Sequence, residues 1–215
     1  MKNNMKKLIH AITLQALFVG SAQNVFAEAG IFSSYGIFSS VNNSGSSLLN
    51  QYYDMQSSTS FPNFQGNNFG TFDLNDSTNL LQIKGGELTF FKDGGWDVTA
   101  AAMYYRISDN LLAPSGSFTT VGFNWIQNIG SNDQKWGRSD LSTNLLNGLI
   151  ANKTYRLEVY FDIDTNQTAP DNKRYDSNSG SNYVSTFSTI PEPSSASLMA
   201  LGVAGLLALR RRRNA

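Results

Sequence analysis

The sequence predicts an all-β protein: a single β-sandwich with Greek-key or jelly-roll-like connections over residues 28–190, flanked by an N-terminal signal peptide and one C-terminal transmembrane helix. Alternating polar and apolar residues recur along this segment, and Gly, Asn and Ser turns separate them at intervals of roughly 8 to 25 residues. Long apolar stripes at helical spacing are scarce. A β-helix is the alternative, but the one visible duplication, Ile-Phe-Ser-Ser at residues 31–34 and 37–40, is too short for a solenoid.

The clearest predicted strand covers residues 154–163, where apolar and polar residues alternate and give the strand one buried face, with Glu158 on the exposed side. A second long strand is predicted over residues 98–107. Residues 87–91 precede it, and the Asp-Gly-Gly turn at residues 93–95 predicts a hairpin between the two. Leu145, Leu146 and Leu149 are expected to close one end of the core. Further strands are predicted over residues 31–41, 51–55, 80–84, 118–126 and 183–189.

The N-terminus has the layout of a secretory signal peptide. Lys2, Lys6 and Lys7 form a basic start, residues 8–19 are mostly apolar, and residues 25–27 supply acceptable residues at a cleavage site. We therefore expect export through the Sec machinery and cleavage after Ala27, so residues 1–27 are left out of the fold prediction.

The C-terminal 25 residues carry the most specific pattern in the chain. Pro191, Glu192 and Pro193 precede 16 uncharged residues, 194–209, which a cluster of four arginines follows: Arg210, Arg211, Arg212 and Arg213. A helix over the uncharged run would be about 24 Å long, a little short of a bilayer core of about 30 Å. Four adjacent arginines resist burial and favour the cytoplasmic membrane face. The run predicts a transmembrane helix over about 194–209 rather than a buried core helix.

This layout over residues 191–215 resembles the PEP-CTERM sorting signal of Gram-negative bacteria. The resemblance implies an exosortase-type membrane enzyme as partner, acting near residues 191–193. It further implies a transient anchor in the inner membrane, followed by delivery to the outer surface or the extracellular matrix, and a link to exopolysaccharide and biofilm production. A plain C-terminal membrane anchor is the alternative.

The segment between the two ends is acidic and lacks two catalytic residue types. The whole chain has 16 basic and 16 acidic residues, but residues 28–190 hold nine basic and fifteen acidic ones, which argues against nucleic acid as a partner. The chain has no cysteine, and its single histidine, His10, lies in the signal peptide. Residues 28–190 therefore cannot form disulfides, thiolate or histidine metal sites, or Ser-His-Asp and Cys-His catalytic groups.

This middle segment also resembles a β-sandwich module of secreted bacterial surface proteins that has no agreed activity. The resemblance covers about residues 31–190 and rests on short pieces, none of them a specific motif. They include Phe-Gly-Thr-Phe at 69–72, Lys-Gly-Gly-Glu at 84–87, Tyr-Tyr-Arg at 104–106 and Tyr-Arg-Leu-Glu-Val-Tyr at 155–160. The resemblance implies a fold and leaves the activity open.

A calcium site is one hypothesis for the loop that follows the strand at 154–163. Asp162, Asp164 and Asn166 place an oxygen at every second residue, as calcium loops do. Gln167 replaces the turn glycine of an EF-hand and Lys173 replaces its bidentate glutamate, so an EF-hand is excluded. A looser site using these three residues and Asp171 stays open beside the simpler interpretation of a solvated acidic loop.

Aromatic side chains suggest a ligand patch. Trp96 and Trp136 each adjoin a glycine and are expected to be exposed, whereas Trp125 is expected in the core together with Phe123. Combined with the tyrosines at 52, 53, 104 and 160, the two exposed tryptophans would suit a carbohydrate-binding module.

The favoured interpretation is an exported, non-enzymatic surface or matrix protein with a structural or adhesive role. The carbohydrate-binding module is its first alternative. The second is a histidine-free glycoside hydrolase that uses paired carboxylates, although the middle segment offers only three glutamates, at positions 28, 87 and 158.

Overall fold

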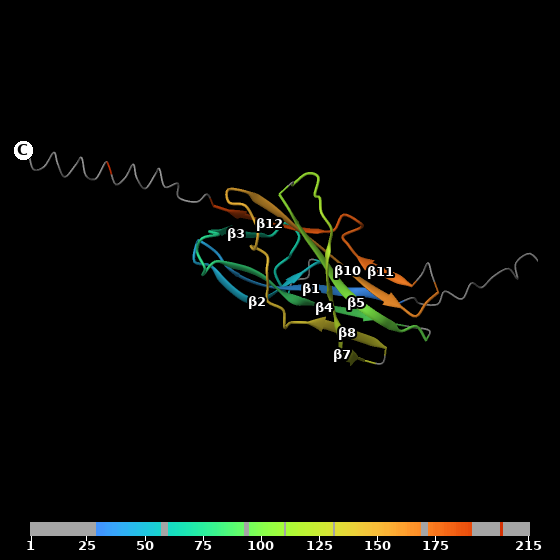
Figure 1. The fold of residues 1–215 in the computed structure, drawn as a ribbon. Helices are drawn as coiled ribbons and strands as arrows, with labels where there is room; N and C mark the ends of the chain where they lie inside the picture. Colours follow the sequence, from blue (N-terminus) through green and yellow to red (C-terminus); the bar gives the residue numbers. More distant parts are fainter. Residues whose placement is uncertain are drawn as a thin grey trace, which may run out of the picture.

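The computed structural model describes residues 29–56, 60–92, 95–109, 111–130, 132–168, 172–190 and residue 203. Within these ranges the chain forms two six-stranded β-sheets that face one another, which confirms the predicted all-β class (Figure 1). No helix in the described part of the chain is long and apolar enough to cross a membrane, and the predicted helix over 194–209 lies outside the described residues apart from Val203. The predicted signal peptide and the cleavage site after Ala27 also lie outside them.

Sheet A has the strand order β2-β1-β4-β8-β7, with the short β9 paired to β4, and all of its pairings are antiparallel. Its strands are β1 (Gly30–Val41), β2 (Ser47–Asp54), β4 (Leu80–Phe91), β7 (Asn124–Ile129), β8 (Asp133–Arg138) and β9 (Thr143–Asn144).

Sheet B has the order β3-β12-β10-β5-β6, with β11 paired to β10, and only the β3–β12 pairing is parallel. Its strands are β3 (Asn68–Phe72), β5 (Val98–Ser108), β6 (Thr119–Gly122), β10 (Thr154–Thr165), β11 (Lys173–Asp176) and β12 (Tyr183–Thr189).

The core lies between the sheets because each long strand turns every second side chain inward. Sheet A contributes residues such as Phe38, Leu88 and Phe90, and sheet B contributes the alternating apolar residues of β10, as predicted. Leu145 and Leu146 are buried in the same core, with Leu149 packed against it, so the expected closure of one end is confirmed.

Two predicted strands, 80–84 and 87–91, are one strand in the structure. β4 runs through Gly85, where the register against β1 shifts and the backbone takes a φ of +141°. A Cβ atom at this position would lie 1.8 Å from the carbonyl oxygen of Arg138 on the neighbouring chain segment, so only glycine fits. The glycines therefore mark a bulge inside a strand rather than a loop between two strands.

The predicted hairpin between residues 87–91 and 98–107 is wrong. β4 lies in sheet A and β5 lies in sheet B, so the connection between them crosses from one sheet to the other. The Asp-Gly turn signal at 93–94 lies outside the described residues, and such a signal specifies a change of direction without specifying the pairing that follows.

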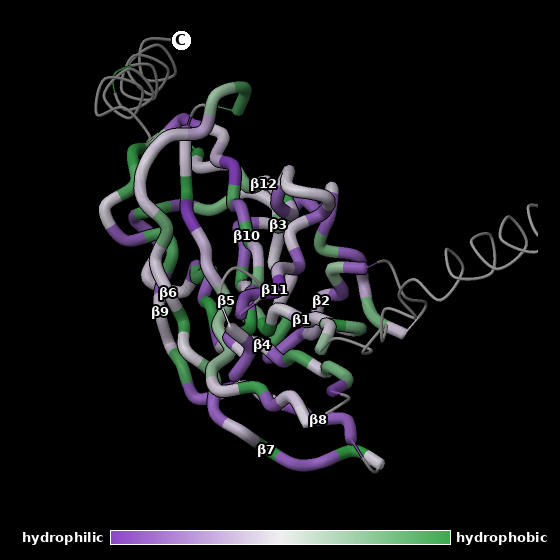
Figure 2. Tube along the Cα trace, turned by 90° about the vertical axis from the view of Figure 1, so that its right-hand side faces the viewer, coloured by the Kyte–Doolittle hydropathy of each residue, from purple (hydrophilic) through white to green (hydrophobic). Residues whose placement is uncertain are grey.

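The predicted strand over residues 118–126 is also two strands. The chain leaves sheet B after β6 and enters sheet A at β7, with buried Phe123 between them. Figure 2 shows β7 as the outlying strand of sheet A at this edge. This switch joins the two sheets along one side of the sandwich.

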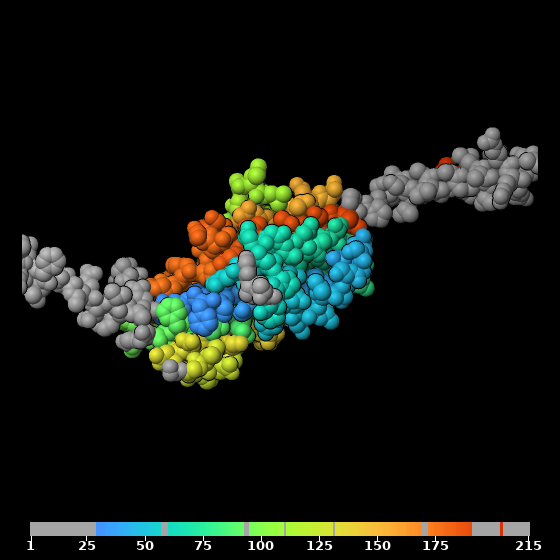
Figure 3. Space-filling view, turned by 180° about the vertical axis from the view of Figure 1, so that it is seen from behind, coloured from blue at the N-terminus to red at the C-terminus, as the bar shows by residue number. Residues whose placement is uncertain are grey.

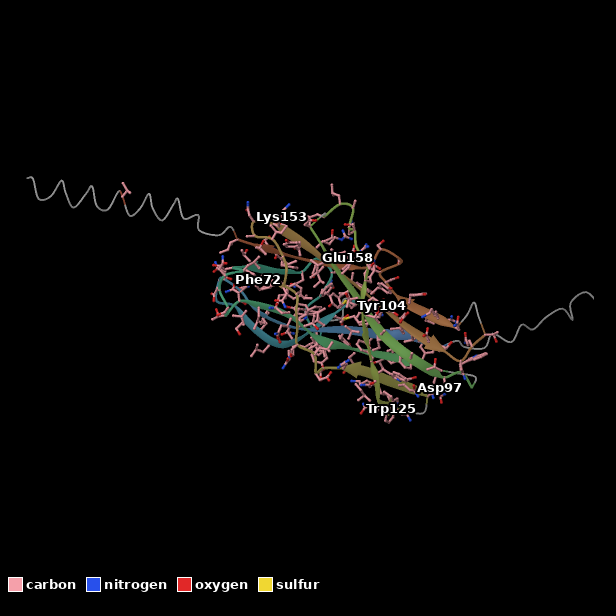
Figure 4. All side chains as sticks on the ribbon, viewed as in Figure 1. Phe72, Asp97, Tyr104, Trp125, Lys153 and Glu158 are labelled. Atoms are coloured by element: carbon pink, nitrogen blue, oxygen red, sulfur yellow. The ribbon has the colours of Figure 1, made fainter. Side chains whose placement is uncertain are left out.

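The two ends of the sandwich differ in which chain segments leave them. β1 begins beside the end of β4, where Gly30 pairs with Phe91. β12 finishes at the opposite end, where Thr189 pairs with Phe72 and the loop before β10 lies alongside. Figure 4 shows Phe72 and Lys153 toward this second end and Asp97 and Trp125 toward the first.

Candidate functional site

An aromatic strip crosses the outer face of sheet B. Tyr104 on β5 and Tyr160 on β10 are cross-strand partners, and their rings stack with centroids 4.6 Å apart and planes 3° apart. Phe118, just before β6, meets Tyr160 edge-on at 4.9 Å. These side chains face outward because their neighbours along each strand, such as Met103 and Phe161, occupy the core. We call Tyr104, Phe118, Tyr160 and Tyr175 the aromatic strip.

A buried carboxylate borders the aromatic strip on one side. Glu158 is only 2% exposed, and it pairs with Arg106 through Oε2 and with Arg156 through Oε1, at 2.6 Å from Nη2. The guanidinium of Arg106 also lies 4.5 Å from the centre of the Phe118 ring. The prediction that Glu158 is exposed is therefore wrong, since two arginines cover this side of β10.

A second buried carboxylate borders the other side. Asp162 accepts a hydrogen bond from Lys173 Nζ at 3.1 Å, and burial raises its pKa. Burial, and then the nearby charge and hydrogen bond of Asp162, raise the pKa of the Tyr104 phenol to about 12. Hydrogen bonds to Asp164 and Asp162 raise the pKa of Lys173. The strip is thus held between an ion-paired glutamate and an ion-paired aspartate.

The three oxygen groups proposed for calcium have protein partners in the structure. Lys173 Nζ lies 3.1 Å from Asp162 and 2.5 Å from Asp164, so an ammonium sits between the two carboxylates. Asn166 Oδ1 instead accepts a hydrogen bond from the backbone N–H of Asp97 at 2.8 Å. Asp171 lies outside the described residues, and within the described ranges no three acidic side chains are grouped as a metal ion would require.

Tyr175 forms the open end of the aromatic strip. It pairs with Asp162 across β10 and β11, and its side chain is 59% exposed. It also lines a polar hollow of about 430 Å³. The other residues that line this hollow are Met55, Gln56, Asp176, Ser177, Asn178, Ser179 and Tyr183. An exposed ring therefore stands between a row of fixed side chains and a hydrophilic depression.

Asp176 forms the wall of this hollow and links the two sheets. It accepts hydrogen bonds from the hydroxyls of Ser34 on β1 and Tyr183 on β12, and from Gln56 Nε2 at 3.2 Å. Burial, followed by the hydrogen bond to Asp176, raises the pKa of Tyr183. These partners come from both sheets and fix the shape of the hollow.

The tryptophans lie differently from the prediction. Trp125, expected in the core, is 54% exposed on edge strand β7, because the chain changes sheets at Phe123 (Figure 4). Trp136, expected to be exposed, packs against the core on β8, and its ring centroid lies 6.3 Å from that of Phe90. Its indole N–H donates to Gln134 at 3.1 Å. Trp96 is half-buried.

The tyrosines of the predicted patch are not brought together. Tyr104 and Tyr160 stack on the outer face of sheet B, whereas Tyr53 is buried in the core. Tyr52 contacts Tyr35 and Phe61 beside sheet A. Sequence reasoning missed Phe118 and Tyr175 as members of the strip. No polar–apolar alternation marks Tyr175 in the sequence, because Lys173, Arg174 and Asp176 around it are all charged.

Hydrogen bonds hold the chain at the end of β12, directly before the C-terminal segment. The N–H of Ile190 donates to the carbonyl of Phe72 at 3.0 Å, and the N–H of Thr189 donates to that of Lys153 at 2.8 Å. The Thr189 hydroxyl donates to the carbonyl of Ile150 at 2.8 Å. The body therefore holds the chain by hydrogen bonds up to Ile190, directly before Pro191.

Comparison with known protein families identifies this C-terminal segment. The family model of the PEP-CTERM protein-sorting motif matches residues 189–213, which confirms the resemblance found in the sequence. A comparison with curated proteins found no match to the chain. The motif implies an exported protein that an exosortase processes at the membrane and directs toward the cell surface. The chain therefore carries a PEP-CTERM sorting signal at residues 189–213.

Proposed function

We propose that this protein is a non-enzymatic adhesive component of the cell surface or extracellular matrix, and that the aromatic strip with its hollow binds polysaccharide. Its tail, residues 194–209, would anchor it transiently in the inner membrane before an exosortase acts near residues 191–193. The PEP-CTERM motif supports the route. The sheet B face supports the binding role.

The exposed ring of Tyr175 is the main observation in support of the binding role. An exposed aromatic ring offers a large, rigid apolar surface at low entropic cost, which suits the C–H face of a sugar ring. Charged groups that would hydrogen-bond to sugar hydroxyls lie close by, on Asp162, Lys173 and Asp176. Because ion pairs and hydrogen bonds already fix these groups, binding would order few side chains.

The test uses the full chain in detergent and a panel of neutral and acidic polysaccharides in affinity electrophoresis. We expect retardation by at least one polysaccharide and its loss in Tyr175→Ala, with circular dichroism showing that the variant stays folded. No retardation by any polysaccharide, or equal retardation of the variant, would overturn the binding role.

The same samples test the non-enzymatic part of the proposal. Asp176 is the buried carboxylate that lines the hollow, so a hydrolase would depend on it. We expect no release of reducing ends from any polysaccharide in the panel. Release by the wild type that disappears in Asp176→Asn would instead favour a glycoside hydrolase.

A further inference from the structure

The end of the body from which the sorting segment leaves carries strongly exposed apolar side chains. Among the described residues, three large hydrophobic side chains are more than 60% exposed: Leu112 at 97%, Leu49 at 68% and Ile150 at 64%. Leu49 lies near the start of β2, and the other two lie in the loops that follow β5 and precede β10. All three belong to segments at the end where β12 finishes.

Hydrogen bonds and an ion pair connect two of these segments with the end of β12. Thr189 is the last residue of β12, and its hydroxyl donates a hydrogen bond to the Ile150 carbonyl at 2.8 Å. Lys153 pairs with Asp109 at 3.6 Å, and Arg156 Nη1 donates to the Leu111 carbonyl at 3.2 Å. Figure 3 shows the loop after β5 and the loop before β10 projecting together from the same side of the body.

The sequence leaves little chain between this end and the apolar run. Residues 191–193 are all that separates Ile190 from Ser194, and two of the three are prolines. Three residues in an extended or polyproline II conformation span only about 10 Å. If residues 194–209 cross the bilayer, Ile190 lies within roughly that distance of the membrane surface.

We propose that this end of the body is a membrane-contacting surface, on which Leu112 and Ile150 enter the lipid interface while the protein awaits sorting. The inference rests on the proposed membrane anchor. The short spacer brings the surface to the bilayer, and apolar side chains gain from leaving water there. Contact would hold the body in one orientation and present residues 191–193 to a membrane enzyme at a constant height.

The charges at this end indicate which lipids suit the surface. Lys153 is paired with Asp109, and Arg106 and Arg156 share Glu158, while the loop between β3 and β4 adds Asp73 and Asp76. Among these side chains the acidic groups outnumber the basic ones by one. Net negative charge disfavours an anionic membrane. We therefore expect contact with zwitterionic phosphatidylethanolamine and phosphatidylcholine, and weaker contact as anionic lipid is added.

The absence of cysteine allows a direct test, because a single introduced thiol can be labelled uniquely. The full chain is reconstituted as Leu112→Cys or Ile150→Cys, each labelled with an environment-sensitive fluorophore, in zwitterionic vesicles that carry nitroxide lipid. Ile126→Cys on β7 is the matched control, since Ile126 is 45% exposed but lies on the outlying edge strand. Vesicle flotation in the same samples reports anchoring.

We expect all three variants to float, with fluorescence quenched at least threefold more in the first two variants than in Ile126→Cys. A Gly-Ser spacer of 15 residues inserted after Ile190 should reduce that difference while leaving flotation intact. Flotation without preferential quenching would overturn the inference and leave the anchor standing. Failure to float would overturn the proposed anchor and this inference with it, without touching the polysaccharide role.

Discussion

Aromatic rings gather on the outer side of both sheets, but their surroundings differ. Beside sheet A, Phe61 from the segment after β2 stacks on Tyr52 at 5.3 Å and meets Tyr35 edge-on at 5.4 Å. On sheet B, Tyr104 and Tyr160 stack between two ion-paired carboxylates, and Tyr175 stays exposed beside a hollow.

The tyrosine rings beside sheet A are packed against Phe61, whereas the ring of Tyr175 on sheet B is exposed to solvent. On sheet A a residue of the protein already covers the tyrosines, so the cluster is explained by stability. On sheet B buried charges hold the strip rigid, yet its end is open. Buried charges cost free energy to desolvate and are weak evidence of stability alone, so the binding role proposed for this face rests on the exposed ring of Tyr175 rather than on these ion pairs.

The largest effect on stability is expected from a substitution of Glu158 on sheet B. Glu158→Gln removes the charge that pairs with Arg106 and Arg156, and leaving two partly buried guanidinium groups unpaired should cost about 3 kcal/mol of unfolding free energy. Glu87→Gln is the matched variant on sheet A, where the carboxylate pairs with Lys135 at 2.7 Å in a more exposed setting. It should cost less than about 1 kcal/mol.

Urea denaturation of both variants measures this comparison. A loss for Glu158→Gln no greater than that for Glu87→Gln would show that the buried pair on sheet B contributes no more than an ordinary surface pair.

An intermediate effect is expected at the link between the sheets. Asp176→Asn replaces an acceptor of three hydrogen bonds with a group that is half donor, facing the hydroxyls of Ser34 and Tyr183. We expect a loss of about 2 kcal/mol in thermal or urea unfolding. Asp140→Asn is the control, since Asp140 pairs with Arg138 at the exposed surface and its loss should change little. Equal stability of the two variants would refute the link.

The smallest expected effect is a change in the pKa of a single side chain, Tyr104. Tyr104 ionises at about pH 12 in the folded protein and at its ordinary 10.0 when unfolded, so its contribution to stability is present below pH 10 and is lost as the pH rises toward 12. The difference between wild type and Tyr104→Phe in tyrosinate absorbance isolates this step. Asp162→Asn should lower that pKa while burial keeps it above 10, and Asp133→Asn on sheet A should leave it unchanged. An unchanged Tyr104 pKa in Asp162→Asn would show that Asp162 does not raise it.

The alternation of polar and apolar residues correctly predicted which side chains face the core. It did not predict which side chains on the outer faces of the sheets are buried. Residues 154–163 gave the correct strand and its correct core face, because the period of two is a local property. The same pattern placed Glu158 in solvent. Its burial depends on Arg106, which lies 52 residues away in the sequence, and no local pattern encodes that pairing.

The tryptophans show the same limit. Trp125 and Trp136 are partners across β7 and β8, and their exposure depends on the chain changing sheets at Phe123. A single residue between two strands gives no sequence signal of such a switch. The sorting motif, in contrast, was predictable because it is a linear sequence whose order of residues is itself the signal.

Affinity for a polysaccharide, measured side by side for Tyr175→Ala and Phe61→Ala, tests the central claim most directly. The first variant removes the exposed ring of sheet B and the second removes the covering ring of sheet A. We predict about tenfold weaker binding for Tyr175→Ala, as expected for one lost aromatic contact, and unchanged binding for Phe61→Ala. Equal losses in the two variants, or a loss confined to Phe61→Ala, would contradict the assignment of the binding face to sheet B.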